Sequence, residues 1–211
     1  GSTQLAITGE NQVVDLGGHA LTTANNWGGI SLKNGATIKN GTITHAGNTA
    51  AIKAFNGSSV ENVTINATCA TADKTVTGIA VQQGATVESI KNVTINGVSQ
   101  GIEVGYQATV GLIEKAIVNE RNNGTAKGIG LVINGTEAKT EIGNVTINVS
   151  ETSTTALREM MSKDLYDEIL SDTANLIGAD FFVGILLAGE VTVTGDITIE
   201  VEEAMLQPVV K

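Results

Sequence analysis

Asn62-Val63-Thr64-Ile65 decides the fold, because this four-residue phrase recurs along the chain. Identical copies stand at residues 92–95 and 144–147, and altered copies at 40–43, 115–118 and 196–199. The last residues of the first five copies are separated by 22, 30, 23 and 29 positions. A recurrence of about 20 to 50 residues indicates stacked supersecondary units. The chain is therefore predicted to be a repeat protein.

Two more phrases precede these copies. Gly-Ile-x-Val occurs at residues 78–81 and 101–104, and Gly-Ala-Thr-Val occurs at 84–87. The second phrase aligns with Gly57-Ser58-Ser59-Val60 in the preceding unit. Apolar residues alternate with polar or small ones in each phrase, which predicts three short strands per unit. The predicted fold class is all-β: a right-handed parallel β-helix solenoid of about seven coils, with residues 1–211 forming one domain.

The stretch Gln12-Val13-Val14-Asp15-Leu16-Gly17-Gly18-His19-Ala20-Leu21-Thr22 resembles the entry coil of the pectate-lyase-like (pectin lyase-like) β-helix superfamily. The following coils resemble that superfamily over nearly the whole chain. Its members include polysaccharide lyases and hydrolases, phage tailspikes and fibres, and bacterial surface adhesins. The resemblance concerns the fold, since such scaffolds carry many unrelated functions.

One segment departs from the β pattern. From about 154 to 177 the apolar residues recur at intervals of three and four, which predicts an α-helix with one apolar face. Ser and Thr precede this segment and Gly178 follows it, where helix caps belong. We expect residues 150–182 to be a helical insertion between coils. On the analogy with fibres we expect a homotrimer, with the helix contact made by Leu157, Met161, Leu165 and Ile169.

The long connections are expected to leave the solenoid at one corner. Residues 66–77, 119–127 and 150–182 all follow a copy of Asn-Val-Thr-Ile. Insertions at one corner of a solenoid gather along one edge, which is often the binding side. The alternative is that these are neutral connections with a helix that covers apolar surface.

Composition excludes several classes of partner. Acidic residues outnumber basic ones and give a formal charge of −10, so the basic stripe that nucleic-acid binding requires is missing. No apolar run reaches the roughly 18 residues of a membrane span, so no membrane insertion is expected. A solenoid is held by stacking, so the lone Cys69 is compatible with an exterior location.

The repeated Asn has a structural and a chemical interpretation. Asn40, Asn62, Asn92 and Asn144 each begin an Asn-x-Thr glycosylation motif. An Asn at the same turn of successive coils can also adopt the left-handed conformation and bond to its equivalent in the next coil. Because the motif coincides with the repeat, we favour an asparagine ladder.

No catalytic residue, metal site or cofactor is predicted. One Cys and the scattered His19 and His45 do not make a zinc site, and we expect His19 to be structural and His45 to be exposed. Glycoside hydrolysis uses two facing carboxylates. The coils carry outward-facing acids whose commoner role is solvation: Glu61, Glu88, Glu103, Glu114 and Glu141.

The remaining candidates are ligand-binding side chains. Trp27 lies in a polar turn where its ring can stack on a sugar or instead cap the first coil; Tyr106 and Arg121 are the other candidates. Together with the resemblance, these residues suggest a non-enzymatic module of an extracellular, cell-surface or virion protein. Its expected roles are those of a spacer and a receptor- or glycan-recognition surface, as in an adhesin or phage fibre. The alternative is a polysaccharide lyase or glycoside hydrolase.

Overall fold

The computed structural model describes residues 4–23, 29–69, 75–121, 128–134, 139–150, 156–162, 181–187 and 190–201. Over these ranges the protein is all-β and consists of two parallel sheets. Sheet A contains, in spatial order, β1 (Leu5–Ile7), β4 (Ile30–Leu32), β6 (Ile52–Ala54), β8 (Thr77–Val81), β10 (Gln100–Val104), β12 (Ile129–Ile133), β16 (Phe181–Leu187) and β15 (Ala156–Ser162).

Sheet B contains the copies of the Asn-Val-Thr-Ile phrase. Its strands are β2 (Val13–Asp15), β3 (Ala20–Thr23), β5 (Thr37–His45), β7 (Ser59–Ala67), β9 (Thr86–Val98), β11 (Thr109–Arg121), β13 (Lys139–Ile142), β14 (Val145–Ser150), β17 (Glu190–Val193) and β18 (Ile197–Val201). The two segments predicted as separate strands form one long strand in β5, β7, β9 and β11. They remain separate in the first and last units.

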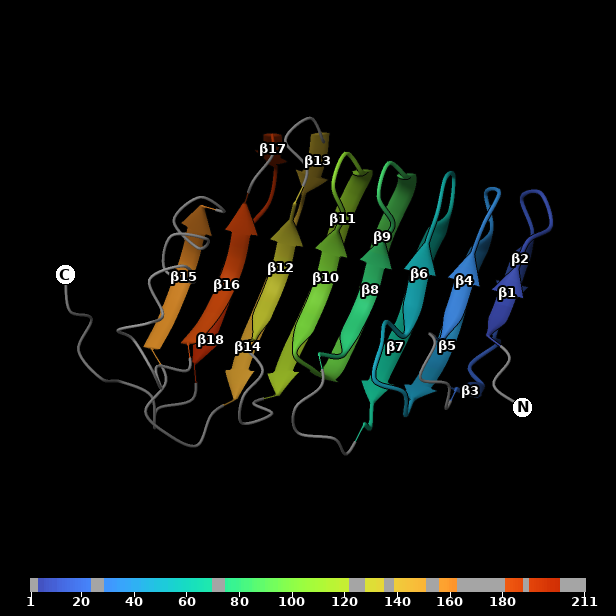
Figure 1. Cartoon of the computed structure of the whole chain (residues 1–211), viewed down its shortest axis with the longest axis horizontal. Helices are drawn as coiled ribbons and strands as arrows, with labels where there is room; N and C mark the ends of the chain where they lie inside the picture. The colour runs from blue at the N-terminus through green and yellow to red at the C-terminus, as the bar shows by residue number, and fades with distance from the viewer. Residues whose placement is uncertain are drawn as a thin grey trace.

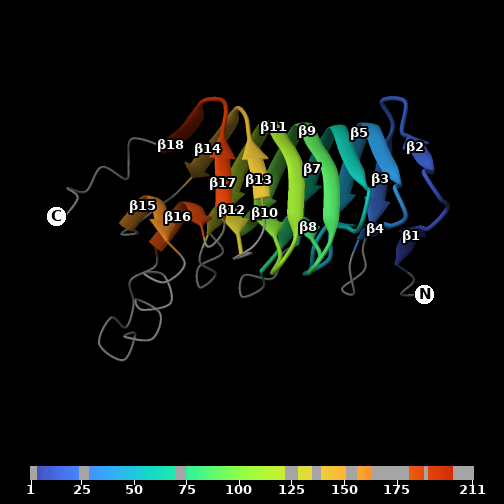
Figure 2. The same ribbon diagram turned by 90° about the horizontal axis from the view of Figure 1, so that it is seen from above.

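The chain passes alternately through the two sheets, and each passage pairs with the next one. Figure 1 shows the strands of sheet A side by side from β1 to β15, and Figure 2 shows sheet B as a second layer. The register follows the sequence repeat: Ile65 pairs with Ile95, and Ile52 pairs with Ile79. One strand of sheet A and the sheet B strand or strands that follow it are called a repeat unit below.

The core lies between the two layers and consists of stacked aliphatic side chains. Ile43, Ile65 and Ile95 from sheet B are fully buried, as are Ile52 and Ile79 from sheet A. The predicted alternation therefore places one or two apolar side chains of each segment inside, each at about 4.8 Å from its equivalent in the next strand. Burial of this continuous apolar column is the main source of stability.

The asparagine ladder is confirmed for three copies of the phrase. Asn92 Nδ2 donates to Asn62 Oδ1 at 3.0 Å, and Asn62 Nδ2 donates to Asn40 Oδ1 at 3.0 Å. Asn40 Nδ2 then donates to both carboxylate oxygens of Asp15 at 3.1 Å. These three asparagines have φ between 50° and 58°, the left-handed region that asparagine tolerates. Each ladder residue thus bends its strand and bonds across units.

The fourth predicted ladder residue has a different partner. Asn144 Nδ2 donates to Glu114 Oε1 at 2.8 Å, and the Asn144 backbone N–H donates to Glu114 Oε2. These hydrogen bonds lower the pKa of Glu114. A second ladder, which the sequence analysis did not identify, lies one position beyond the phrase. It runs from Asn148 through Asn119 and Asn96 to Asn66, each Nδ2 donating to the preceding Oδ1.

The helix predicted for residues 154–177 is wrong for the part that the structure describes. Residues 156–162 form β15, which pairs in parallel with β16 at the edge of sheet A. Helix propensity is a weak preference, and the unpaired backbone groups of an edge strand override it here. Leu157 and Met161 therefore lie on a strand, whereas Leu165, Ile169 and the rest of the predicted helix fall outside the described residues.

Candidate functional site

The turns from sheet A to sheet B form one edge of the protein, at the top of Figure 1. We call it the turn edge and define it by residues 33–36, 55–58, 82–85 and 105–108. In each turn the fourth residue donates its N–H to the carbonyl of the first, for example Ser58 to Phe55 at 3.1 Å and Ala85 to Gln82 at 2.9 Å. Successive turns are therefore similar four-residue loops.

Most neighbouring turns are also bonded to each other. Gly35 N–H donates to Asn56 O at 3.0 Å, and Gly84 N–H donates to Tyr106 O at 2.9 Å. By this pattern Gly57 N–H would donate to Gln83 O, but it donates to Thr86 O instead, at 2.7 Å. The second and third turns are therefore not joined in the usual way.

A longer start of the sheet B strand β9, rather than a longer turn, accompanies this break. Ala54 and Ser59 are five positions apart, whereas their partners Val81 and Ser89 are eight positions apart. Three additional residues, 86–88, therefore stand at the start of β9, and residues 109–111 of β11 pair with them. The phrases at residues 57–60 and 84–87 occupy the same place in their units, but they do not pair with each other, because Val60 pairs with Ile90.

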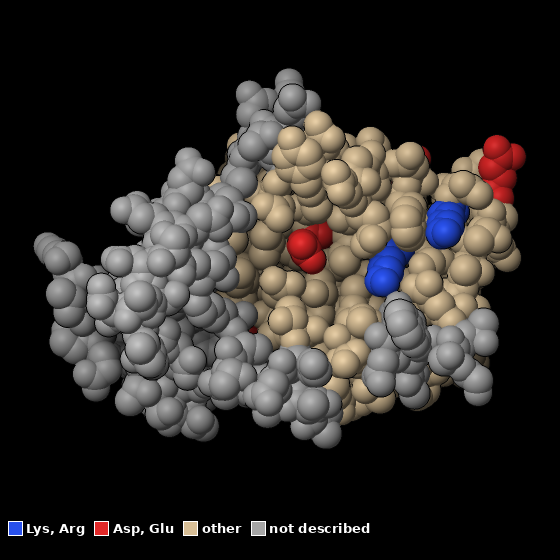
Figure 3. Space-filling view, viewed as in Figure 1, with Lys and Arg blue, Asp and Glu red and all other residues tan. Residues whose placement is uncertain are grey.

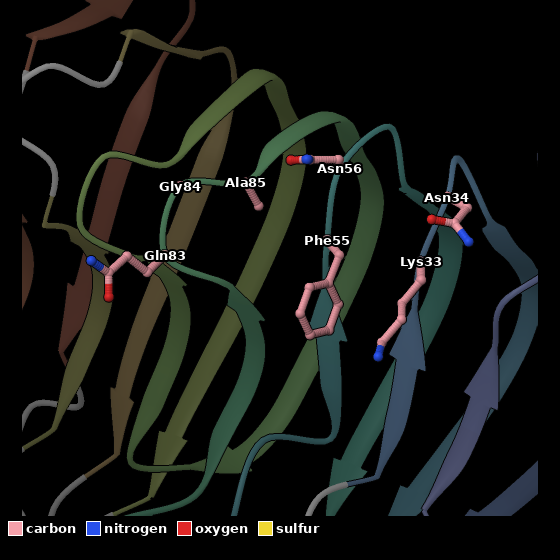
Figure 4. A pocket seen from close by; sticks show the side chains of 7 residues that line it. All are labelled: Lys33, Asn34, Phe55, Asn56, Gln83, Gly84 and Ala85. Atoms are coloured by element: carbon pink, nitrogen blue, oxygen red, sulfur yellow. The ribbon is translucent and has the colours of Figure 1, made fainter.

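A cavity of about 240 Å³ lies beside these turns, where β9 begins three residues earlier than its pairing with β7 (Figure 4). Its lining is mostly polar and comes from three successive turns: Lys33, Asn34, Phe55, Asn56, Gln83, Gly84 and Ala85. The Lys33 ammonium lies over the Phe55 ring, 5.0 Å from its centroid, in a cation–π contact. One aromatic ring among amides and a cation is the composition of a small polar ligand site rather than of an apolar pocket.

Local hydrogen bonds orient two of the amides in the lining. Asn56 Oδ1 accepts from the Thr86 backbone N–H at 2.8 Å, so its Nδ2 remains as a donor. Asn34 Nδ2 donates to Thr8 O at 2.8 Å, so its Oδ1 remains as an acceptor. Gln83 is exposed and makes no hydrogen bond with the described part of the chain. The site therefore offers one oriented donor, one oriented acceptor, the Gln83 amide, and the Lys33 ammonium over the Phe55 ring.

Of the predicted ligand-binding residues, the structure places Tyr106 at the turn edge, with 47 % of its surface exposed. Trp27 falls outside the described residues. Arg121 is the last residue of β11, and its side chain is outside the described part. The long connections were predicted to mark the binding edge, but residues 70–74, 122–127, 151–155 and 163–180 lie outside the described residues. The cavity lies at a different corner.

The outer face of sheet A carries the carboxyl group of Glu103, which is partly buried. Ser31, Lys53, Ala80, Glu103 and Val132 occupy equivalent positions on successive strands. Burial raises the pKa of the Glu103 carboxyl. Figure 3 shows this face of the protein with few charged side chains among the described residues.

Two ionisable groups are buried at the carboxyl ends of the sheet B strands. Both Glu120 carboxylate oxygens are buried without a hydrogen-bond partner, and burial raises the pKa of Glu120 far above its usual range. His45 was expected to be exposed but is fully buried, with Nδ1 2.8 Å from Thr23 Oγ1. Burial lowers the pKa of His45. The period-2 pattern places both side chains inward, which the sequence analysis missed.

Within the described ranges no three His, Cys, Asp or Glu side chains form a group suited to a metal ion. The same residues include no helix with the length and apolar character that a membrane span requires. The chain matches no model of a known protein family, no curated protein and no solved structure. The candidate site therefore has to be interpreted from its own chemistry.

Proposed function

We propose that the chain is a right-handed parallel β-helix that serves as a non-enzymatic module of an extracellular, cell-surface or virion protein. It would act as a stiff spacer and recognise a glycan or a receptor, as an adhesin or a phage fibre does. The resemblance of residues 12–22 to the pectate-lyase-like superfamily supports the fold assignment. Regular parallel pairing over two sheets supports the stiffness.

The observation that carries the recognition role is the cavity at the turn edge. Its Phe55 ring, Lys33 ammonium and oriented Asn34 and Asn56 amides match the mixed character of a sugar, which has apolar C–H faces and polar hydroxyls. The negative face of an aromatic ring attracts polarised C–H groups. Tyr106 extends the same edge.

A glycan array tests this proposal. We expect the wild-type protein to bind a subset of glycans and the Phe55→Ala protein to lose most of that binding. Ile117→Ala is the matched control, because Ile117 is 40 % exposed on sheet B and lies away from the turn edge. Absence of binding to every glycan on the array would leave only the spacer role.

Glu103 favours a second candidate function, that of a polysaccharide lyase or glycoside hydrolase. A carboxyl group with a raised pKa is suited to general acid or base catalysis near neutral pH. A screen with polysaccharides should then detect cleavage that Glu103→Gln abolishes, with Glu88→Gln as the control on an exposed carboxylate. Cleavage that survives Glu103→Gln would exclude this role for Glu103.

The homotrimer remains a proposal that rests on the fibre analogy. The apolar helix expected at its interface is not formed at residues 156–162, which are a strand. Light scattering of the intact chain tests the trimer directly: a mass three times that of the monomer is expected, and a monomer mass would refute it.

A further inference from the structure

We infer that the ligand of the turn edge is an uncharged, N-acetylated linear glycan that lies along the edge, with one sugar in the cavity beside Phe55 and a later sugar at Tyr106. This inference rests on the proposed function and adds the class, direction and minimum length of the ligand.

The positions of the two aromatic residues give the direction. Phe55 follows β6 and Tyr106 lies in the turn after β10, two repeat units further along sheet A. Neighbouring strands lie about 4.8 Å apart, so the two units are separated by about 10 Å along the sheet. A single sugar ring is too small to contact both side chains. A linear oligosaccharide laid across the strands reaches both.

The cavity itself has room for one sugar. Its volume of about 240 Å³ is below the roughly 300–1,000 Å³ of sites that enclose drug-sized ligands. An alanine methyl group built at Gly84 would meet nothing within 4 Å, so the space beside this lining residue is open. The remaining sugars can therefore leave the cavity over Gly84 and continue towards Tyr106.

The oriented amides select the chemical class. An acetamide group has one carbonyl acceptor and one N–H donor. The lining supplies one donor of this kind, Asn56 Nδ2, and one acceptor, Asn34 Oδ1, on neighbouring turns. Lys33 is held over the Phe55 ring. The formal charge of −10 for the whole chain opposes the approach of an acidic polysaccharide. An uncharged N-acetylated sugar therefore fits better than an acidic one.

Calorimetric titration with N-acetylglucosamine and its β-1,4-linked dimer, trimer and tetramer tests the inference. For the wild-type protein we expect the affinity to rise by about tenfold or more between monomer and trimer, as a second contact is added. Tyr106→Ala should remove this gain while leaving the monomer affinity unchanged. Phe55→Ala should lower the affinity for every ligand, and Ile117→Ala should leave every affinity unchanged. Far-UV circular dichroism confirms that each variant is folded.

Other outcomes separate the inference from the proposed function. Equal affinity for all chain lengths, or no effect of Tyr106→Ala, would refute the extended ligand and leave a single-sugar site. Tighter binding of a galacturonic acid trimer than of the N-acetylglucosamine trimer would refute the N-acetylated class. Failure of these probes together with an empty glycan array would refute the recognition role itself.

Discussion

Gly101 and Val118 are so closely packed that an added methyl group has no space between them. A Cβ atom built on Gly101 would lie 2.5 Å from Val118 Cγ1 and would also overlap the Gly130 carbonyl oxygen. Gly78 has the same relationship with Ile95, and Gly130 has it with Ile147. A glycine at this position, which begins Gly-Ile-x-Val at Gly78 and Gly101, is thus required by the last residue of the sheet B phrase in the same unit.

Gly101→Ala should therefore destabilise the protein by about 3 kcal/mol or more, since part of the obstruction is backbone that cannot move aside. Thermal and urea unfolding measure the effect. Gly9→Ala is the control, because the added methyl there meets mainly the flexible end of the Gln12 side chain. Similar stability of the two variants would contradict the close packing at Gly101.

The asparagine ladder predicts a graded response at Asn62. Asn62→Gly keeps the left-handed conformation but removes the amide bonds to Asn40 and Asn92, which costs about 0.5–1.5 kcal/mol per hydrogen bond. Asn62→Ala removes the same bonds and must also adopt φ of 53°, which adds about 1–2 kcal/mol. Urea unfolding should rank the proteins wild type, Asn62→Gly, Asn62→Ala. Equal destabilisation would mean that the conformational cost is negligible.

The buried carboxyl group of Glu120 should make the stability of the protein decrease as pH rises. Because burial raises its pKa, the folded protein holds the proton more tightly than the unfolded chain does. Stability should fall as pH rises above about 4.3, the ordinary glutamate pKa. Glu120→Val, which copies the paired residues Val98 and Val149, should be more stable than wild type by about 1–3 kcal/mol at pH 7.

Unfolding measured from pH 4 to pH 8 checks this expectation. The advantage of Glu120→Val should shrink towards pH 4, where the carboxyl is neutral in both states. Glu88→Gln removes an exposed carboxylate from β9 and controls for the change in net charge. A difference that does not vary with pH would show that ionisation of Glu120 is unrelated to stability.

Asp15 predicts the opposite dependence at lower pH. Hydrogen bonds from the Gly17 N–H and from Asn40 lower its pKa, and Lys39 contributes at 3.8 Å. The carboxylate therefore adds stability above about pH 4 that is lost as pH falls through its folded pKa. Asp15→Asn should have a flatter stability curve between pH 2 and 5 than wild type. Unchanged acid unfolding would indicate that the ladder end contributes nothing.

The sequence predicted the repeat and the ladder well because both depend on local, periodic rules. Alternation at Ile65 and Ile95 requires only the two-residue period of a strand, and Asn62 tolerates a conformation that few other residues adopt. The helix prediction failed at residues 156–162, where pairing with β16 decided the structure. The repeat and the ladder depend on local sequence, whereas the conformation of residues 156–162 depends on the neighbouring strand β16.

The cavity lies where the pairing of β7 with β9 differs from the pairing that the similar phrases suggest. Residues 57–60 resemble 84–87, yet Val60 pairs with Ile90. Counting to the Asn-Val-Thr-Ile phrase could have exposed the difference of three positions, because Gly57 stands five positions before Asn62 and Gly84 stands eight before Asn92. The sequence could not show whether Val60 pairs with Val87 or with Ile90. The pairing depends on how the backbone groups of Ser58, Thr86 and Glu88 bond across units. Small changes of strand length therefore produce features that residue identities alone do not predict.

The chemistry at the ends of the asparagine ladder has a consequence for assembly. Asp15 can only accept hydrogen bonds and occupies one end; Lys115, which can only donate, occupies the equivalent left-handed position beyond Asn92. Asn40, Asn62 and Asn92 are interchangeable, but these ends are not. If a strand slipped by one whole unit, the residues at both ends of the ladder would lose their hydrogen-bonding partners. The ends of the ladder thus favour the correct stacking order over shifted orders that bury the same aliphatic core.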